Sequence, residues 1–326
     1  MKTVVVTTSP GFGKVGCVPQ RIQEHDWEFI RCTDTTRPDG GVADHIERME
    51  FLVVGLIPAT AAVIGNAPRL RAVLKHGVGV DNIDVPAATA RGIPVFNTPG
   101  ANANAVAELA LGSMLSLARR IPMMHQVVVG GAWQRHIGTE VEGKTLGVVG
   151  LGNIGKTLAR KARALGMKVV ATELYPDAAF VREHGIELLG LDALLAQADY
   201  VSLHVFGGKD NAHLIGAAEL ARMKPTAYLM NFARGEVVDL DALTAALQSD
   251  RLMGAAIDAY VAEPPDRSHP IFVHPRVVFT PHCGADTTES VERMGLMTIA
   301  DIDTVLAGDR SPRVLNPEIY ATPQRG

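Results

Sequence analysis

The stretch of sequence that decides the fold is Gly143-Lys-Thr-Leu-Gly-Val-Val-Gly-Leu-Gly-Asn-Ile-Gly155, followed by a run of strong helix formers that ends at Gly166. Residues 145–149 are apolar and β-branched enough to predict a strand, so Gly150, Gly152 and Gly155 stand between a strand and a helix. A glycine turn at this place lets a dinucleotide pyrophosphate approach the free amides of a helix N-terminus. The stretch therefore predicts a dinucleotide-binding unit.

The acidic residue that should accompany such a turn is Glu173, eighteen residues after Gly155 and at the end of the next predicted strand. Its carboxylate can accept hydrogen bonds from an adenosine ribose diol, and its charge would repel a 2′-phosphate. We therefore expect NAD (NADH) rather than NADP.

A second copy of the glycine pattern lies at Gly11, Gly13 and Gly16, with Asp34 eighteen residues later. Spacing alone does not separate the two copies. Pro10 precedes this copy and Pro19 follows it, and helical patterning after Gly16 is weak. The fold needs the third glycine inside a helix, so we expect the first copy to bind no nucleotide.

Short β-branched runs alternate with longer helical patterns along the whole chain, which is typical of α/β architecture with parallel strands. The runs form two series, separated by an almost wholly apolar helical pattern at 105–120 that predicts a buried helix at a domain junction. We expect strands at 3–7, 28–32, 51–55, 72–75 and 94–96, and then at 145–149, 168–172, 199–204, 227–231, 253–258 and 277–280.

The domain boundary should lie close to the junction helix, because Pro99 and Gly100 end the preceding strand and Asn102 or Asn104 can cap the helix. A last helical pattern covers 290–306. The tail after it has no obvious partner of its own, and we expect it to return to the first domain.

Composition excludes several classes of protein. A chain of 326 residues predicts about two domains. The formal net charge of −4 gives no basic surface for nucleic acid or an acidic membrane, so we expect neither partner. The three cysteines are too scattered for a disulfide framework, and no apolar run suits a signal peptide or a membrane helix, so a cytoplasmic protein is expected. His269, His274 and His282 lack the spacing of a zinc site, and no metal is expected.

Polar residues gather where the predicted strands of the second series end, and ligands of open parallel sheets bind outside those carboxyl ends. They are His204, Asn231 with Arg234, Asp258 with Glu263, and His282. An arginine can bind a carboxylate and polarise a carbonyl, and a histidine oriented by a carboxylate can move a proton. This set suits hydride transfer to a small 2-oxo acid. The alternatives are structural: Arg234 as a solvated turn residue, His204 as a packed histidine, and Glu263 as the cap of a proline turn.

The residues together resemble the D-isomer-specific 2-hydroxyacid dehydrogenase family, which includes D-3-phosphoglycerate dehydrogenase. The likeness covers nearly the whole chain. It rests on Lys75-His-Gly-Val-Gly-Val-Asp-Asn-Ile-Asp84, Asn97-Thr-Pro, Val106-Ala-Glu108, the 143–155 stretch, Asn231-Phe-Ala-Arg-Gly235, Glu263-Pro264 and Pro281-His-Cys-Gly284.

The resemblance implies a flavodoxin-like substrate domain made of 1–99 and 290–326, with an inserted Rossmann NAD-binding domain at 100–289 that usually forms the homodimer. It implies His282 as acid and base, Glu263 supporting it, and Arg234 binding substrate, with the substrate carboxylate on the backbone amides of Val78 and Gly79. The cofactor contacts that it implies are at Val106, Gly150, Gly152, Asn153, Ile154, Gly155, Glu173, His204, Val205, Phe232, Ala233, Arg234, Asp258, His282 and Gly284.

The substrate should be a small 2-hydroxy or 2-oxo acid such as hydroxypyruvate, glyoxylate or a phosphoglycerate-like acid. Phosphoglycerate enzymes tend to carry a basic residue in the loop that corresponds to 54–58, which is apolar here, so a substrate phosphate would need another cation such as Arg135. Two other hypotheses remain. One is an NAD-sensing interaction protein similar to the corepressors built on this fold, and the other is a phosphite dehydrogenase, which would need more cations near Val78.

Overall fold

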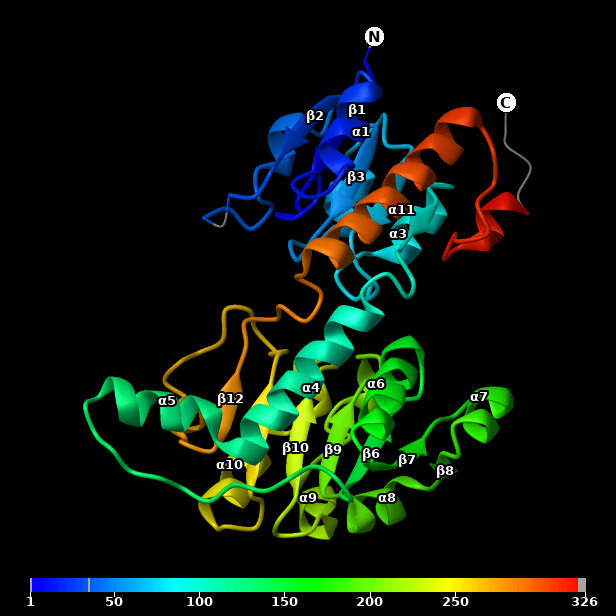
Figure 1. Cartoon of the computed structure of the whole chain (residues 1–326). Coiled ribbons are helices and arrows are strands. Elements are labelled where there is room, and N and C mark those ends of the chain that lie inside the picture. Colours follow the sequence, from blue (N-terminus) through cyan, green and yellow to red (C-terminus); the bar gives the residue numbers. More distant parts are fainter. Residues whose placement is uncertain (1, 35, 322–326) are drawn as a thin grey trace. The chain divides into compact units, whose positions relative to one another are not determined.

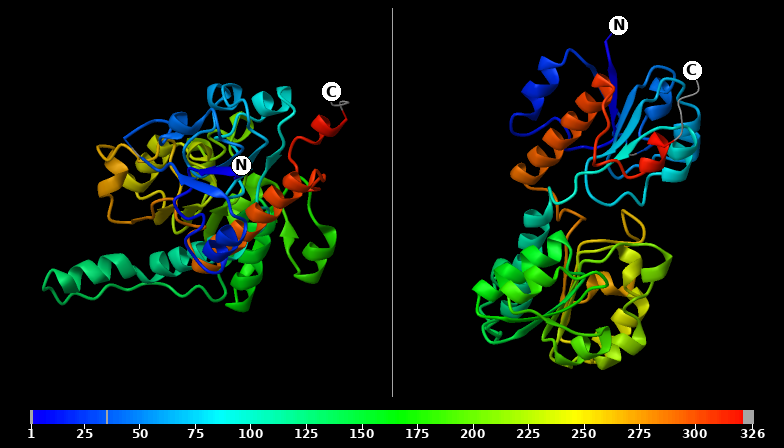
Figure 2. Two further views of the ribbon diagram at one scale, coloured as in Figure 1. Left: turned by 90° about the horizontal axis from the view of Figure 1, so that it is seen from above. Right: turned by 90° about the vertical axis from the view of Figure 1, so that its right-hand side faces the viewer.

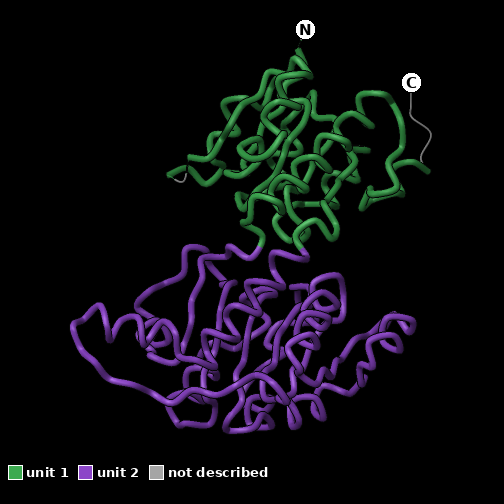
Figure 3. Tube along the Cα trace, in the orientation of Figure 1, with its two compact units in different colours: residues 1–102, 285–326 green, residues 103–284 purple. Residues whose placement is uncertain are grey.

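The chain divides into two compact units in a computed structural model that describes residues 2–34 and 36–321. Unit 1 comprises Met1–Asn102 and Ala285–Gly326, and unit 2 comprises Ala103–Gly284 (Figure 3). The expected boundaries, after residues 99 and 289, lie close to these breaks but do not coincide with them. The first break falls later because the Arg293 guanidinium donates a 2.9 Å hydrogen bond to the Ala101 carbonyl, which ties the turn after Pro99 to unit 1.

Unit 1 is built on a five-stranded parallel sheet with the order β2-β1-β3-β4-β5, which is the flavodoxin-like order. Figure 1 labels β1, β2 and β3 of this sheet. The predicted strands are confirmed with slightly shorter bounds. The elements of unit 1 are β1 (Val4–Thr7), α1 (Val18–Glu24), β2 (Glu28–Arg31), β3 (Phe51–Val54), α2 (Ala61–Gly65), β4 (Ala72–Lys75), α3 (Val85–Ala90), β5 (Val95–Phe96) and α11 (Thr288–Ala307), with 3-10 turns at Val42–His45 and Pro317–Tyr320.

Both faces of the central strands are buried, which explains why β1 and β3 are apolar at successive positions rather than at every second one, whereas the edge strand β2 is only partly buried. Val4 and Val6 pack in the core that includes Ile64 of α2, whereas Val5 packs on the other face with Ile299 of α11. Successive side chains of a strand point to opposite faces. Helices from both ends of the chain are therefore needed to cover the one sheet.

The tail after α11 returns to unit 1, as expected. Val314 forms an antiparallel bridge with Phe96, and the Leu315 amide donates to the Val95 carbonyl at 2.8 Å. Asn316 is almost fully buried and extends this pairing, because its Oδ1 accepts from the Val95 amide and its Nδ2 donates to the Ile93 carbonyl, both at 2.9 Å. The tail thus satisfies the free edge of β5.

Unit 2 is built on a seven-stranded parallel sheet with the order β12-β11-β10-β9-β6-β7-β8. The strand order reverses between β6 and β9, as in a Rossmann fold. The elements of unit 2 are α4 (Ala103–Arg119), α5 (Ile121–Val129), β6 (Thr145–Val149), α6 (Asn153–Ala164), β7 (Lys168–Thr172), α7 (Ala178–Glu183), β8 (Glu187–Leu188), α8 (Leu191–Gln197), β9 (Tyr200–Leu203), α9 (Ala217–Arg222), β10 (Tyr228–Asn231), α10 (Leu240–Gln248), β11 (Gly254–Ile257) and β12 (Val277–Phe279), with 3-10 turns at Lys209–Asn211, Gly235–Val237 and Pro270–Val273.

Helices cover the unit 2 sheet on both faces. α4 and α6 pack on one face, and α8, α9 and α10 on the other (Figure 2). α4 is the buried junction helix that the sequence predicts. None of the helices within the described ranges combines the length and apolarity that crossing a bilayer requires.

Two elements of unit 2 were not predicted. β8 has only two residues, too few for a sequence pattern. α5 follows α4 after Arg120, which takes a left-handed conformation with φ of 53°, and none of its residues is buried. Together with the segment that follows, α5 projects from the rest of unit 2 (Figure 2). We call residues 121–140 the arm.

The first glycine motif serves the packing of unit 1. Gly16 lies outside α1, and a Cβ there would come within 2.1 Å of the Glu292 carboxylate carbon from α11. That carboxylate accepts the Cys17 amide at 2.8 Å. Arg31 meanwhile donates to the carbonyls of Ser9 and Phe12. A side-chain carboxylate thus stands where a bound phosphate would need open amides.

Candidate active site

The glycine loop of unit 2 brings β6, α6 and β9 into close backbone contact. A Cβ on Gly155 would lie 2.1 Å from the Gly150 carbonyl oxygen, and one on Gly150 would lie 2.7 Å from the His204 carbonyl oxygen. Gly150 also has φ of +93°, a conformation that side chains disfavour. Gly152, in contrast, has no atom within 4 Å of its Cβ position, so the space in front of this glycine is open.

That open space lies at the start of α6, which begins at Asn153 and Ile154. The first amides of a helix have no partner inside the helix and carry its positive end. Glu173 lies beside the same loop, because one carboxylate oxygen accepts the Leu151 amide at 2.7 Å and the other accepts the Tyr175 amide at 3.1 Å. Its negative charge is thereby fixed next to the glycine turn.

His204 follows β9 at the edge of this loop, and Val205 continues from it. The ring Nε2 of His204 lies 2.8 Å from the Ser202 hydroxyl, whereas its Nδ1 is covered and has no partner among the described residues. Burial lowers the pKa of this ring to about 3, so the imidazole is neutral at pH 7. The open glycine cradle, the fixed Glu173 charge and the unpaired His204 nitrogen all fit a nicotinamide dinucleotide.

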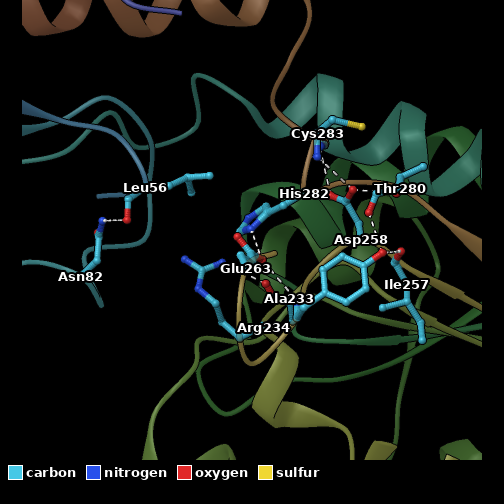
Figure 4. A network of polar contacts seen from close by, with 12 residues as sticks. Leu56, Asn82, Ala233, Arg234, Ile257, Asp258, Glu263, Thr280, His282 and Cys283 are labelled. Carbon is cyan, nitrogen blue, oxygen red and sulfur yellow. Dashed lines mark hydrogen bonds and ion pairs between the residues drawn. The ribbon is translucent and has the colours of Figure 1, made fainter. Parts of the chain in front are cut away.

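The candidate catalytic pair is His282 with Glu263, brought together across nineteen residues of sequence (Figure 4). The His282 Nδ1 lies 2.7 Å from Glu263 Oε1, and both side chains remain partly exposed. His282 has φ of +52°, which places its ring at the turn after β12. Because Nδ1 faces the carboxylate, the ring presents Nε2 away from Glu263.

Glu263 is held in its ionised form. Burial alone would raise the pKa of its carboxyl, but the hydrogen bond and charge of His282, the Tyr260 amide and the charge of Arg234 together lower it. The Tyr260 amide donates to the same oxygen at 3.2 Å. An ionised Glu263 can orient the His282 ring by accepting a hydrogen bond at Nδ1.

Arg234 leaves the end of β10 on a loop that Asn231 fastens. The Asn231 amide group donates to the Arg234 carbonyl at 2.9 Å and its oxygen accepts the Ala233 amide at 3.1 Å. Phe232 and Ala233 of the same loop are nearly fully buried. The guanidinium of Arg234 lies next to Glu263 (Figure 4), with one nitrogen 2.9 Å from the Ala233 carbonyl.

Asp258 organises the segment that carries His282. Its buried carboxylate accepts the Thr280 hydroxyl at 2.6 Å and the amides of Cys283 and Gly284, each at 3.0 Å. A Cβ on Gly284 would lie 3.0 Å from Asp258 Oδ2 and 3.3 Å from Val106 of α4. Asp258, Gly284 and Val106, all expected at the cofactor, therefore gather at one place.

Tyr260 is a residue of the site that sequence reasoning missed. Its hydroxyl donates to the carbonyls of Thr280 at 2.8 Å and Ile257 at 3.2 Å. Burial, followed by the charges of Asp258 and Glu263, raises the pKa of this phenol to about 12. Tyr260 lies two residues after Asp258 in the sequence, but nothing in a linear pattern shows that its hydroxyl reaches Thr280, just after β12.

In unit 1, Val78 and Gly79 lie on a loop after β4, and their amides donate to no other described residue. The Val78 carbonyl accepts from Asn97 at 2.7 Å, which fixes the loop. Asn82 donates to the Gly55 carbonyl at 2.9 Å and to the Leu56 carbonyl at 3.0 Å (Figure 4). The buried Lys75 ammonium adds bonds to Gly55 and Asn82.

The structure therefore groups the expected residues of unit 2 into two clusters, one at the glycine turn and one around His282. Within residues 2–34 and 36–321, no three His, Cys, Asp or Glu side chains gather in a way that could hold a metal ion.

Comparison with known proteins identifies the family. Residues 111–284 match the family model for the "D-isomer specific 2-hydroxyacid dehydrogenase, NAD binding domain". The chain belongs to the D-isomer specific 2-hydroxyacid dehydrogenase family.

Two relatives and one solved structure illustrate the likeness. The chain is 40% identical over 289 residues to a D-3-phosphoglycerate dehydrogenase of Mycobacterium bovis, covering 88% of this chain and 54% of the relative. It is 37% identical over 314 residues to a glyoxylate reductase of Korarchaeum cryptofilum, covering 93% and 94%. A D-lactate dehydrogenase from Aquifex aeolicus, solved with NAD and lactic acid, superposes with a TM-score of 0.83 at 26% identity, covering 96% of this chain and 99% of that one.

The chain spans about half the length of the phosphoglycerate dehydrogenases it matches, and nearly the whole length of the glyoxylate reductase.

Gly235 generates a testable prediction, because a Cβ there would lie 2.1 Å from the Tyr260 carbonyl carbon and 2.2 Å from the Val261 amide. Gly235→Ala should push the 260–263 segment away and lower the free energy of unfolding by about 1–3 kcal/mol, as overpacking does. Gly190→Ala is the matched control, because nothing lies within 4 Å of its Cβ position. Urea unfolding of both variants measures the difference. Equal stability of the two would contradict the close packing of the loop.

Proposed function

We propose that the protein is an NAD-dependent oxidoreductase that interconverts a small D-2-hydroxy acid and the corresponding 2-oxo acid. The observation that carries this proposal is the 2.7 Å contact between His282 and an ionised Glu263, with Arg234 alongside. Family membership supports the reaction class. The substrate acid, the roles of the individual residues and the preference for NAD are our inferences.

In the direction of reduction, His282 donates a proton from Nε2 to the substrate carbonyl oxygen, and in oxidation it takes that proton back. Glu263 holds Nδ1, so that the proton is exchanged at Nε2, and its charge stabilises the imidazolium. The planar guanidinium of Arg234 binds the substrate carboxylate and polarises the carbonyl. Nicotinamide supplies or accepts the hydride when it is bound.

The residues that would hold the cofactor come from both clusters. The pyrophosphate would lie on the amides of Asn153 and Ile154, in the cradle of Gly150, Gly152 and Gly155. The adenosine ribose would lie on Glu173. The further contacts that we propose are Val106, His204, Val205, Phe232, Ala233, Arg234, Asp258, His282 and Gly284.

We also propose that the amides of Val78 and Gly79 bind the substrate carboxylate. The support for this proposal comes from unit 1 itself. Neither amide donates a hydrogen bond to another described residue, and Gly77 has φ of +152°, a conformation that residues with a side chain rarely adopt. Glyoxylate, hydroxypyruvate and phosphoglycerate-like acids are the candidates. Leu56, 57% exposed, gives the neighbouring loop an apolar surface, which favours acids without a phosphate.

The test of the function is NADH oxidation with glyoxylate, hydroxypyruvate, pyruvate and phosphohydroxypyruvate. We expect turnover with at least one of them and a fall in kcat of about 10²–10⁴ in His282→Asn, the loss typical of a missing general acid. Asparagine is chosen because it tolerates the positive φ at this position. NADH affinity, measured by fluorescence titration, should stay within a few-fold. Bound NADH without turnover of any 2-oxo acid would refute the function, and an equal collapse of NADH binding would refute the role of His282.

The preference for NAD over NADP is a proposal that Glu173 carries. Its fixed charge would lie against a 2′-phosphate, so kcat/KM should be higher with NADH than with NADPH. Glu173→Gln keeps an oxygen acceptor and removes the charge, which should raise kcat/KM with NADPH by about tenfold, equal to about 1.4 kcal/mol. Glu187→Gln, an exposed glutamate on β8, is the control. An unchanged ratio of the two cofactors in Glu173→Gln would show that another residue selects the cofactor.

We propose that the protein forms a homodimer through the arm. The arm presents apolar side chains to solvent, among them Trp133 at 88% exposure and Ile137 at 94%, which is unusual unless a partner covers them. Light scattering should give twice the 34.7 kDa chain mass. The double variant Trp133→Ser, Ile137→Ser should be monomeric, whereas Val273→Ser, which removes a valine that is 83% exposed outside the arm, should remain dimeric. A monomer before any substitution would contradict the proposal.

A further inference from the structure

Unit 2 contains a cavity of about 220 Å³ that is lined by none of the residues proposed to bind the cofactor or the substrate. It lies between α10, the 3-10 turn at 270–273, the ends of β10 and β11, and the segment 259–266. Its walls are mainly apolar. The side chains that enclose it include Val238, Leu240, Leu243, Ala256, Tyr260 and Phe272.

The polar groups that line the cavity already have partners. Asn231 is bonded to the loop that carries Arg234. His269 lies 3.0 Å from Asp241, and Asp266 accepts from Ser268. The described lining residues include no lysine or arginine. The cavity therefore offers a polar ligand few free hydrogen-bonding groups.

The cavity is also separate from the positions proposed for the cofactor and substrate. None of the glycines of the 150–155 turn lines it, and neither do Glu173, His204 or Arg234. A 2-hydroxy acid carries a negative charge, and the lining offers it no lysine or arginine but the like charge of the Asp266 carboxylate. The cavity is thus unsuited to either ligand of the proposed reaction.

We propose that this cavity is a binding site for a neutral apolar molecule about the size of a single substituted ring, and that its occupancy is coupled to the Glu263–His282 pair. An apolar cavity of about 150 Å³ remains dry and binds benzene. The larger volume here accommodates a ring with a small substituent, and burying apolar surface supplies the free energy of binding.

The coupling goes through Tyr260, which belongs to both the cavity wall and the catalytic cluster. Its ring lines the cavity, its amide donates to Glu263 Oε1, and its hydroxyl donates to the Thr280 carbonyl, two residues before His282. Its backbone also lies against Gly235. A guest that fills the cavity removes the space into which the Tyr260 ring can move, and so restrains both ends of the pair.

The binding test uses toluene as the probe and the full-length protein with labelled methyl groups. We expect saturable binding of one toluene per chain, with nuclear Overhauser contacts from toluene to the methyl groups of Val238, Leu240 and Leu243. The result does not depend on the proposed function, because no turnover is measured. No saturable binding up to the solubility limit, or contacts to other methyl groups only, would overturn the site.

A matched pair of variants tests the location independently. Val238→Phe places a ring in the cavity and should weaken toluene binding at least tenfold. Val273→Phe makes the same change at an exposed position outside the cavity lining and should leave toluene affinity unchanged. Equal toluene affinity in the two folded variants would overturn the assignment. If Val238→Phe does not fold, the nuclear Overhauser contacts of toluene in the unsubstituted protein decide whether the cavity is the binding site.

The coupling is tested on the His282 ring, whose signals are assigned by their loss in His282→Asn. Toluene should shift these signals at fixed pH in the unsubstituted protein. In Tyr260→Phe, which keeps the ring but lacks the hydroxyl, toluene should still bind and the shift should be at least halved. Binding without any shift of the His282 signals would overturn the coupling. A change in kcat on adding toluene would follow only if the proposed dehydrogenase activity also holds, so the failures of the two proposals are distinguishable.

Discussion

The arrangement of the candidate active site depends on the carboxylate of Asp258. It is buried at the end of β11, and its hydrogen bonds go to the Thr280 hydroxyl and to the amides of Cys283 and Gly284. Those donors lie on both sides of His282, so the carboxylate fixes the turn in which His282 takes a positive φ. Leaving a buried carboxylate or its donors unpaired costs about 1–3 kcal/mol for each group. The backbone of His282 is therefore held by bonds to the chain on both sides of it, and Glu263 orients the ring through Nδ1.

Close contacts of the main chain also explain why glycines stand beside the catalytic groups. Gly235 lets the Tyr260–Val261 backbone approach the Arg234 loop, and Gly284 lets the chain approach Asp258 and Val106. At Gly235 two main-chain segments lie closer than a Cβ would permit, whereas a Cβ at Gly284 would press on the side chains of Asp258 and Val106. The 260–263 segment, which carries Glu263, is thus positioned by backbone contact on one side and by the Tyr260 hydroxyl on the other. An active site built this way depends on a few small residues that have no chemical role.

The sequence predicted the sheet strands well because buried parallel strands are continuous apolar runs, which stand out in a linear pattern. The sequence also predicted correctly that a helix contains the third glycine of the second motif but not that of the first. Gly155 lies within α6, and Gly16 lies outside α1. It could not show that Glu292 fills the first motif, because that contact joins residues far apart in the chain. The clamp by Asp258 and the reach of the Tyr260 hydroxyl were hidden for the same reason. β8 was too short to give a pattern, and α5 has no buried residue to mark a face.

The loop after β3 shows how the shape of a loop can be kept while its surface changes. Asn82 and Lys75 hold it through the carbonyl of Gly55, and Asn82 also bonds the Leu56 carbonyl. These acceptors belong to the main chain, so the bonds do not depend on which side chain stands at position 56. Leu56 itself is largely exposed. A different residue there would alter the chemistry that the loop presents without removing any bond that fixes its path. Divergence of substrate within a family can arise in this way, because the bonds that maintain the loop and the side chain that it displays are separate.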